Sequence, residues 1–198
     1  MARDADQIDG KLLDALAAAG RRLYEGGLAG GTLGSVGVRL PGGKVLVTSG
    51  HSRLGFLGPS DLVMLNGRGP VTPEGQVPSR DSGILYAVLT ARPEAGAVLR
   101  LYPPYSTAFA HKGREFLEKS TKLFTHLQGV AFVPYYRPGT AGLAGAVAEA
   151  LRSNQVAVVE SQGPVIWGSD LEDAVDRAEA FEAACKVAFI LGSERPNP

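Results

Sequence analysis

Two hydrophobic periodicities alternate along this chain of 198 residues, and their alternation is the feature that most constrains its fold. Apolar residues at helical spacing predict amphipathic helices, and short apolar runs between glycine or proline turns predict strands. Because helices and strands are interleaved throughout, we expect a layered α/β domain. The pattern predicts helices over 8–23, 79–91, 105–112, 140–151 and 169–192, and strands over 35–39, 44–48, 97–102, 130–133, 156–160 and 165–167.

The length of the chain suits a single domain over 1–198, with a loop over 70–78 and a loose tail over 193–198. Its 20 basic and 20 acidic residues balance, and no long basic run indicates a nucleic-acid partner. The single Cys185 cannot form an internal disulfide, which fits a reducing compartment. No apolar run reaches the roughly 18 residues of a membrane span, so we expect a cytoplasmic protein with no membrane partner.

Seven short motifs follow one another along nearly the whole chain. They are GLAGGTLGSVGVR at 27–39, VTSG at 47–50, LGPSDLV at 57–63, PSRD at 78–81, ARPEAGAV at 91–98, VPYYRPGT at 133–140 and SQGPVIWG at 161–168. In order and spacing they resemble the class II aldolase/adducin family, which includes fuculose-phosphate aldolase. The resemblance implies a three-layer α/β/α sandwich with a mostly antiparallel central sheet. It also implies a homo-oligomer, commonly a tetramer.

The resemblance further implies that a metal site has lost its ligands. In the family, three histidines hold a divalent metal, usually zinc, and a glutamate acts as acid and base. Arg100 and Tyr102 stand at the two His-x-His positions, and Gln162 stands at the third histidine. Asp81 takes the place of the glutamate. A guanidinium cannot ligate a metal, so we expect neither a metal site nor a cofactor.

Three histidines remain elsewhere in the chain. His51 follows the turn at 49–50 and lies close to the expected pocket, where it could help to recruit a metal. His111 and His126 fall in segments that carry no family ligand. Scattered histidines are more often surface or core residues than ligands, so we do not expect them to rebuild the site.

Arg100 and Tyr102 lie two residues apart on a predicted strand, so both side chains should point into the site. One hypothesis gives them catalytic roles: Arg100 stabilises an oxyanion, Asp81 moves a proton and Tyr102 is a second donor. The structural alternative is an internal ion pair between Arg100 and Asp81 that fills a dead site. Charge balance alone would favour that pair, because a carboxylate that loses its cation is costly to bury.

The anion-binding loops are better preserved than the metal site. In the family, main-chain amides and hydroxyls of three loops hold the substrate phosphate. Glycines let the backbone approach a ligand, and a serine at a helix start presents free amides to an anion. The same residues also suit plain turns, and Ser79 could be only an N-cap. The corresponding residues here are Thr32, Gly34, Ser35, Ser49, Gly50, Ser79 and Arg80, with Gln162 as a further ligand contact.

These observations favour a class II aldolase-like protein that has lost the zinc centre and keeps a pocket for a small phosphorylated or otherwise anionic molecule. Such a chain could be a binding protein, a regulatory protein or a metal-independent enzyme. An active sugar-phosphate aldolase, a carbon–carbon lyase, is the first alternative. A structural oligomerisation module like the adducin head is the second.

Overall fold

The computed structural model describes residues 9–66, 69–71, 76–115 and 127–193. One sheet runs through these residues, and its eight strands follow the order β4-β3-β2-β1-β5-β8-β7-β6. Only the β6–β7 pair is parallel among the described strands, so the sheet is mixed but mostly antiparallel. The strands are β1 (Ser35–Arg39), β2 (Val45–Thr48), β3 (Leu62–Asn66), β4 (Gly69–Val71), β5 (Ala97–Arg100), β6 (Val130–Val133), β7 (Val156–Val159) and β8 (Gly163–Gly168).

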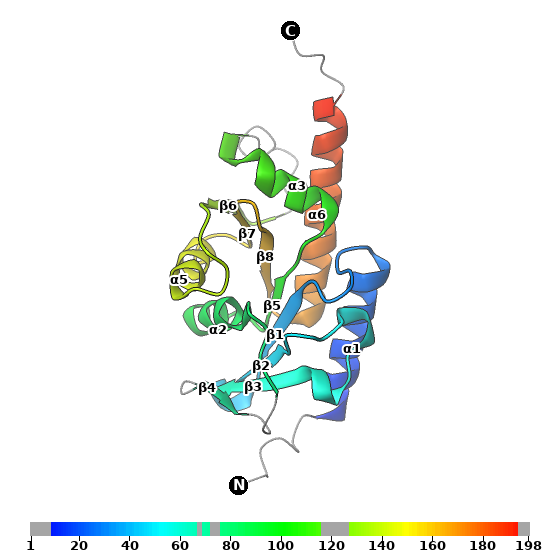
Figure 1. Ribbon diagram of the computed structural model, residues 1–198, viewed down its shortest axis with the longest axis vertical. Helices are drawn as coiled ribbons and strands as arrows, with labels where there is room; N and C mark the ends of the chain where they lie inside the picture. Colours follow the sequence, from blue (N-terminus) through cyan, green and yellow to red (C-terminus); the bar gives the residue numbers. More distant parts are fainter. Residues whose placement is uncertain (1–8, 67–68, 72–75, 116–126, 194–198) are drawn as a thin grey trace.

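Helices cover both faces of the sheet (Figure 1). The helices are α1 (Gly10–Glu25), α2 (Ser82–Ala91), α3 (Pro104–Lys112), α5 (Ala141–Ala150) and α6 (Leu171–Ser193), with short 3-10 turns at Pro41–Gly43, Leu54–Phe56 and Pro59–Asp61. None of the described helices is long and apolar enough to cross a membrane.

Each face of the sheet buries its own hydrophobic cluster, because successive residues of a strand point to opposite sides. Val38 of β1 and Leu99 of β5 belong to the cluster that packs with α1, α3 and α6. Val98 of β5 and Val165 of β8 belong to the cluster that packs with α2 and α5. The predicted three-layer α/β/α sandwich is therefore confirmed.

All the predicted helices and strands are present, and the strands over 35–39 and 130–133 have the predicted bounds, while the others have shifted ends. Two further strands were not predicted. The run from Leu62 to Leu65 is apolar on every residue, and all four residues are buried. A strand covered on both faces shows no alternation, so its pattern does not reveal it. The predicted loop over 70–78 is wrong at its start, where Gly69–Val71 forms β4; residues 72–75 lie outside the described residues.

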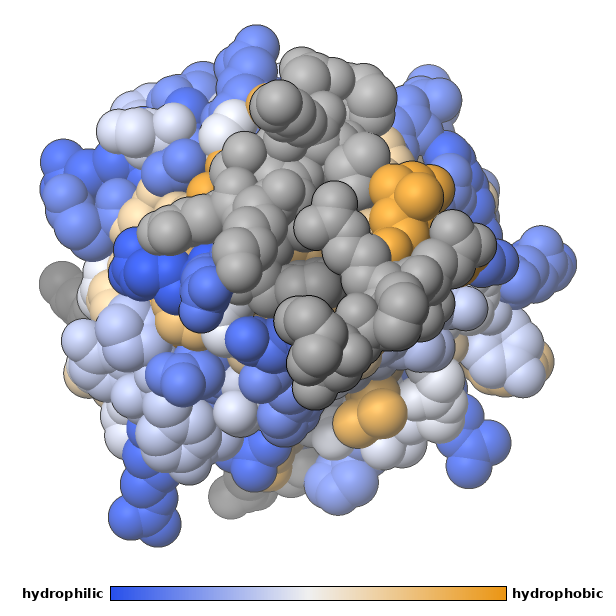
Figure 2. Space-filling view, turned by 90° about the horizontal axis from the view of Figure 1, so that it is seen from above, coloured by the Kyte–Doolittle hydropathy of each residue, from blue (hydrophilic) through white to orange (hydrophobic). Residues whose placement is uncertain are grey.

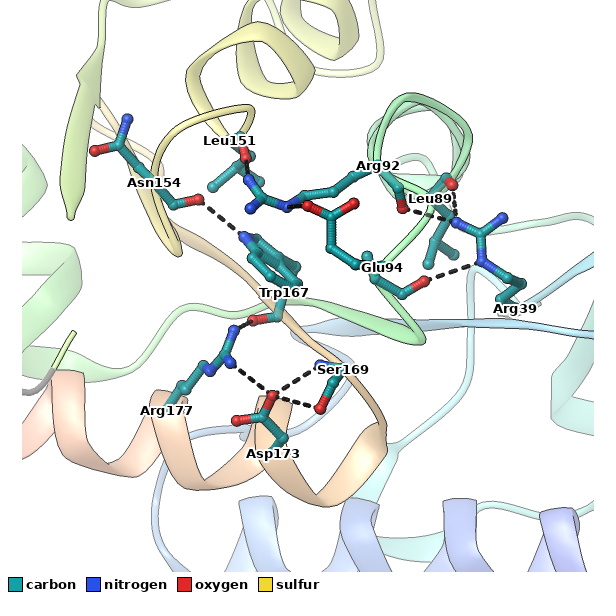
Figure 3. A network of polar contacts seen from close by, with 11 residues as sticks. Arg39, Leu89, Arg92, Glu94, Leu151, Asn154, Trp167, Ser169, Asp173 and Arg177 are labelled. Atoms are coloured by element: carbon teal, nitrogen blue, oxygen red, sulfur yellow. Dashed lines mark hydrogen bonds and ion pairs between the residues drawn. The ribbon is translucent and has the colours of Figure 1, made fainter. Parts of the chain in front are cut away.

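Three arginines join helices to strands at the end of the sheet where β1 finishes (Figure 3). Arg39 donates to three backbone carbonyls in the last turn of α2 and just beyond it. Arg92 donates to the carbonyl of Leu151 at the end of α5. The ring of Trp167 lies between Arg92 and Arg177, whose guanidinium carbons are 3.9 and 4.7 Å from the ring centroid. These contacts satisfy carbonyls that a helix C-terminus leaves without partners.

Candidate functional site

Three loops meet at the opposite end of β1. This strand runs antiparallel to β2 and β5, so the loop before Ser35, the loop after Thr48 and the residues after Arg100 leave the sheet at one edge. An isolated bridge between Ser49 and Pro78 brings the segment before α2 to the same edge. The order of the strands thus gathers loops that lie far apart in the sequence.

The loops enclose a pocket of about 370 Å³. Its lining is mostly polar, with hydroxyl groups from the loops, and Arg80 and Asp81 are the charged residues among those that line it. Leu33 is the one lining residue that was not predicted, since nothing in the sequence distinguishes this exposed apolar side chain. The lining residues are Thr32, Leu33, Gly34, Ser35, Ser49, Gly50, Ser79, Arg80, Asp81 and Tyr102.

Gly34 shapes the first loop. Its φ is +100°, and a Cβ at this position would lie 3.0 Å from the side chain of Leu54. Glycine adopts this conformation without strain, which lets the chain turn directly into β1. The hydroxyl of Ser35 then lies 2.9 Å from the hydroxyl of Ser79, and this hydrogen bond joins the first loop to the third.

The backbone amides of the second and third loops fall into two groups. Those of Ser49, Gly50 and Ser79 donate to carbonyls of the protein itself, at 2.7, 3.1 and 3.1 Å. Those of Arg80 and Asp81 donate to no acceptor among the described residues. They lie just before α2, where the helix dipole favours negative charge. The amides of Arg80 and Asp81, rather than those of the serines, are available to an anion.

The prediction that Ser79 begins or caps a helix is wrong. Helix α2 begins at Ser82, and Asp81 occupies the N-cap position without a side-chain capping bond. Ser79 instead extends the sheet, because its amide donates to the carbonyl of Thr48 at 3.1 Å. Tertiary pairing has overridden the local capping pattern.

The segment over 134–140 supports the rim of the pocket. Arg80 is exposed there, and Gly139 packs against it, since a Cβ on Gly139 would lie 2.9 Å from Cγ of Arg80. The side-chain amide of Gln162 donates to the carbonyl of Tyr136 at 2.6 Å. Gln162 therefore faces this segment and is not among the residues that line the pocket.

Arg100 is completely buried and does not line the pocket either. Its guanidinium donates to the carbonyls of Pro164 and Gln162, at 3.1 and 2.9 Å. The predicted ion pair with Asp81 does not form, because no carboxylate of the described residues pairs with this guanidinium. Burial is the main reason why the pKa of Arg100 is lowered from its usual value.

Tyr102 stands between the two charges. Its ring centroid is 4.4 Å from the guanidinium carbon of Arg100, and its hydroxyl donates to Oδ2 of Asp81 at 3.2 Å. Burial raises the pKa of Tyr102, and Asp81 adds to that increase, while Arg100 opposes it. The phenol is therefore neutral at physiological pH and can donate a hydrogen bond.

The side chains at this edge do not fit a metal ion. Arg100 is a buried cation, and the hydroxyl of Tyr102 is already bonded to Asp81. No group of three or more histidine, cysteine or acidic side chains within the described ranges could hold a metal. His51 is exposed and does not line the pocket, His111 lies on α3, and His126 lies outside the described residues.

Comparison with known proteins gives one consistent result. A sequence model described as "Class II Aldolase and Adducin N-terminal domain" matches residues 14–189. A relative in Escherichia coli K12, named 3-oxo-tetronate 4-phosphate decarboxylase, is 30% identical over 98% of this chain and 92% of its own length. A relative of the same name in Haemophilus influenzae is 31% identical over 89% of this chain and 86% of its own.

Solved structures with a similar fold are consistent with this family match. The protein YgbL of Escherichia coli has a TM-score of 0.81 at 29% identity, covering 95% of this chain and 92% of that one. An L-fuculose 1-phosphate aldolase has a TM-score of 0.82 at 20% identity, covering 95% and 90%, which supports the fold alone.

Proposed function

The chain belongs to the class II aldolase and adducin N-terminal domain family, and from this premise we propose that it binds a small phosphorylated molecule without the family's zinc-dependent aldolase mechanism. Its relatives are named as enzymes of phosphorylated sugars and sugar acids, which sets the class of ligand. The ligand occupies the pocket between the three loops.

One observation carries this proposal: the pocket gathers anion donors at the N-terminus of α2. The free amides of Arg80 and Asp81 lie beside the hydroxyls of Ser35, Ser49 and Ser79. Hydrogen bonds from amides and hydroxyls, together with the helix dipole, favour a phosphate. The guanidinium of Arg80 adds a charged donor with the planar geometry that suits phosphate oxygens.

The proposal that zinc chemistry is absent is supported by the residues at the ligand positions. The family resemblance assigns these positions to Arg100, Tyr102 and Gln162. In the structure, Arg100 and the amide nitrogen of Gln162 donate to carbonyls, and the hydroxyl of Tyr102 donates to Asp81. A buried guanidinium would also repel a divalent cation.

Titration calorimetry with glycerol phosphate tests the binding proposal. We expect a saturable exothermic or endothermic signal with one site per chain, and about tenfold weaker binding for Arg80→Ala, which removes a charge-assisted hydrogen bond. The matched control is Arg152→Ala, since Arg152 is exposed, does not line the pocket and forms its ion pair with Glu149. A folded protein that binds no phosphate ester would contradict the proposal and favour a structural module.

A second candidate is a carbon–carbon lyase that uses no metal. The hydrogen bond between Tyr102 and Asp81 favours it, because it places a neutral phenol and a carboxylate together at the wall of the pocket. Asp81 would move a proton, and Tyr102 would donate to an oxyanion. Turnover of a phosphorylated sugar acid that persists with a strong chelator and is lost in Asp81→Asn supports this candidate, whereas turnover that requires metal contradicts it.

A further inference from the structure

Arg100 is a buried cation that forms no ion pair within the part of the chain that the structure describes. Its side chain has no exposed surface, and no described carboxylate forms an ion pair with it. An unpaired buried charge costs several kcal/mol of stability unless hydrogen bonds or an anion offset the loss of water. Among the described residues, Asp81 acts on this charge only from beyond Tyr102, so no carboxylate there contacts the guanidinium directly.

The hydrogen bonds of Arg100 are also incomplete. A guanidinium has five N–H donors. Two of them reach carbonyls of Pro164 and Gln162 within 3.1 Å, and the contact with the carbonyl of Leu101 is long, at 3.5 Å. The Nε–H is buried and has no hydrogen-bond partner among the residues that the structure describes. This donor remains open on a side chain that is otherwise held in place.

Arg100 adjoins the pocket through two neighbours. It pairs across the sheet with Ser35, which lines the pocket. The ring of Tyr102, which also lines the pocket, lies against its guanidinium at 4.4 Å. Tyr102 in turn is tied to Asp81 by a single hydrogen bond of 3.2 Å, which is long for an O–H donor. Tyr102 thus lies beside the guanidinium of Arg100 at the pocket wall, and its hydroxyl is held there by one long hydrogen bond.

We propose that the ligand carries a second anionic group, a carboxylate, and that Arg100 binds this group after the side chain of Tyr102 turns aside. This inference rests on the proposed function, in which the phosphate lies at Arg80 and the N-terminus of α2. The carboxylate supplies the missing counterion and accepts the open Nε–H, in the bidentate geometry that guanidinium and carboxylate share. The ligand class is a phosphorylated sugar acid or a smaller phosphorylated hydroxy acid.

The test compares three probes by titration calorimetry: inorganic phosphate, glycerol phosphate and 3-phosphoglycerate. Glycerol phosphate and 3-phosphoglycerate are similar in size, and the second adds a carboxylate. For the wild-type protein we expect 3-phosphoglycerate to bind at least about tenfold more tightly than glycerol phosphate, as a charge-assisted bidentate pair would give. Equal affinities would overturn the inference while leaving the proposed function intact. Failure of all three probes to bind would overturn both.

Substitution at Arg100 locates the second subsite. Arg100→Met keeps the apolar volume, and we expect it to bring the ratio of the two affinities to about one, because the carboxylate loses its partner. Arg152→Met, the same change at an exposed arginine, should leave the ratio at its wild-type value. A ratio that stays high in Arg100→Met would overturn the inference.

A second variant covers the case in which Arg100→Met does not fold. Tyr102→Phe removes only the hydroxyl that ties the ring to Asp81. If Tyr102 must turn aside, the ratio of the affinity for 3-phosphoglycerate to the affinity for glycerol phosphate should be higher in this variant than in the wild type. A lower ratio in Tyr102→Phe would contradict a covering role for this side chain.

Discussion

Gly34 and Arg100 show what individual residues contribute at this edge of the sheet. Gly34 has a positive φ, and a Cβ there would lie 3.0 Å from the side chain of Leu54, so the first loop depends on the absence of a side chain at this position. The sequence predicted that the backbone at Gly34 approaches a ligand closely, and this stays a prediction. It predicted the direction of Arg100 only in part: the two-residue spacing puts Arg100 and Tyr102 on one face, but only Tyr102 lines the pocket. Whether a side chain reaches a pocket depends on the residues that pack around it, and the spacing of residues along the chain gives no information about them.

The Gly34→Ala variant tests the backbone argument. We expect a loss of about 1–2 kcal/mol in the free energy of unfolding, because a Cβ is strained at this φ. Urea denaturation followed by circular dichroism measures it. The matched control is Gly30→Ala, where an added Cβ meets nothing within 4 Å and the change should stay within about 0.5 kcal/mol. A Gly34→Ala variant as stable as this control would contradict the argument.

At the scale of elements, the start of α2 decides what the pocket can bind. The sequence placed this start at Ser79, from a serine followed by a helical pattern, but Ser79 pairs with the strand layer. Local capping patterns cannot report a long-range backbone bond of this kind. The later start leaves the amides of Arg80 and Asp81 without acceptors among the described residues, and the proposed function makes them donors to the phosphate.

The arginine contacts at the far end of the sheet give a prediction for the elements. Arg39→Met leaves carbonyls at the end of α2 without donors, and we expect a loss of about 2 kcal/mol in the free energy of unfolding. The affinity for glycerol phosphate should not change, because Arg39 and the pocket lie at opposite ends of β1. Chemical denaturation and calorimetry on the same preparation measure both. A loss of affinity without a loss of stability would contradict this assignment.

At the scale of the whole molecule, the fold was predictable and the site was predictable in outline. The alternating periodicities predicted the layered α/β fold, and the seven ordered motifs predicted the family. A family sequence model then matched residues 14–189. Strand β3 was not predicted, because both of its faces are covered and its residues show no alternation of apolar and polar side chains. The loops of the pocket were predicted because the motifs lie in them. The burial of Arg100 and its lack of a described carboxylate partner were not predicted, because both depend on how the whole chain packs.

The central claim is that this member of the family works without a bound metal, and elemental analysis of the purified protein tests it most directly. The protein should be prepared without chelator and without metal-affinity resin, and measured by inductively coupled plasma mass spectrometry. The account predicts a ratio of zinc, manganese and cobalt to chain near zero. The triple variant with Arg100→His, Tyr102→His and Gln162→His is the positive control, since three histidines are the usual donors of such a site. About one equivalent of metal in the wild-type protein, as in a catalytic zinc enzyme, would contradict the account and favour a metal-dependent lyase.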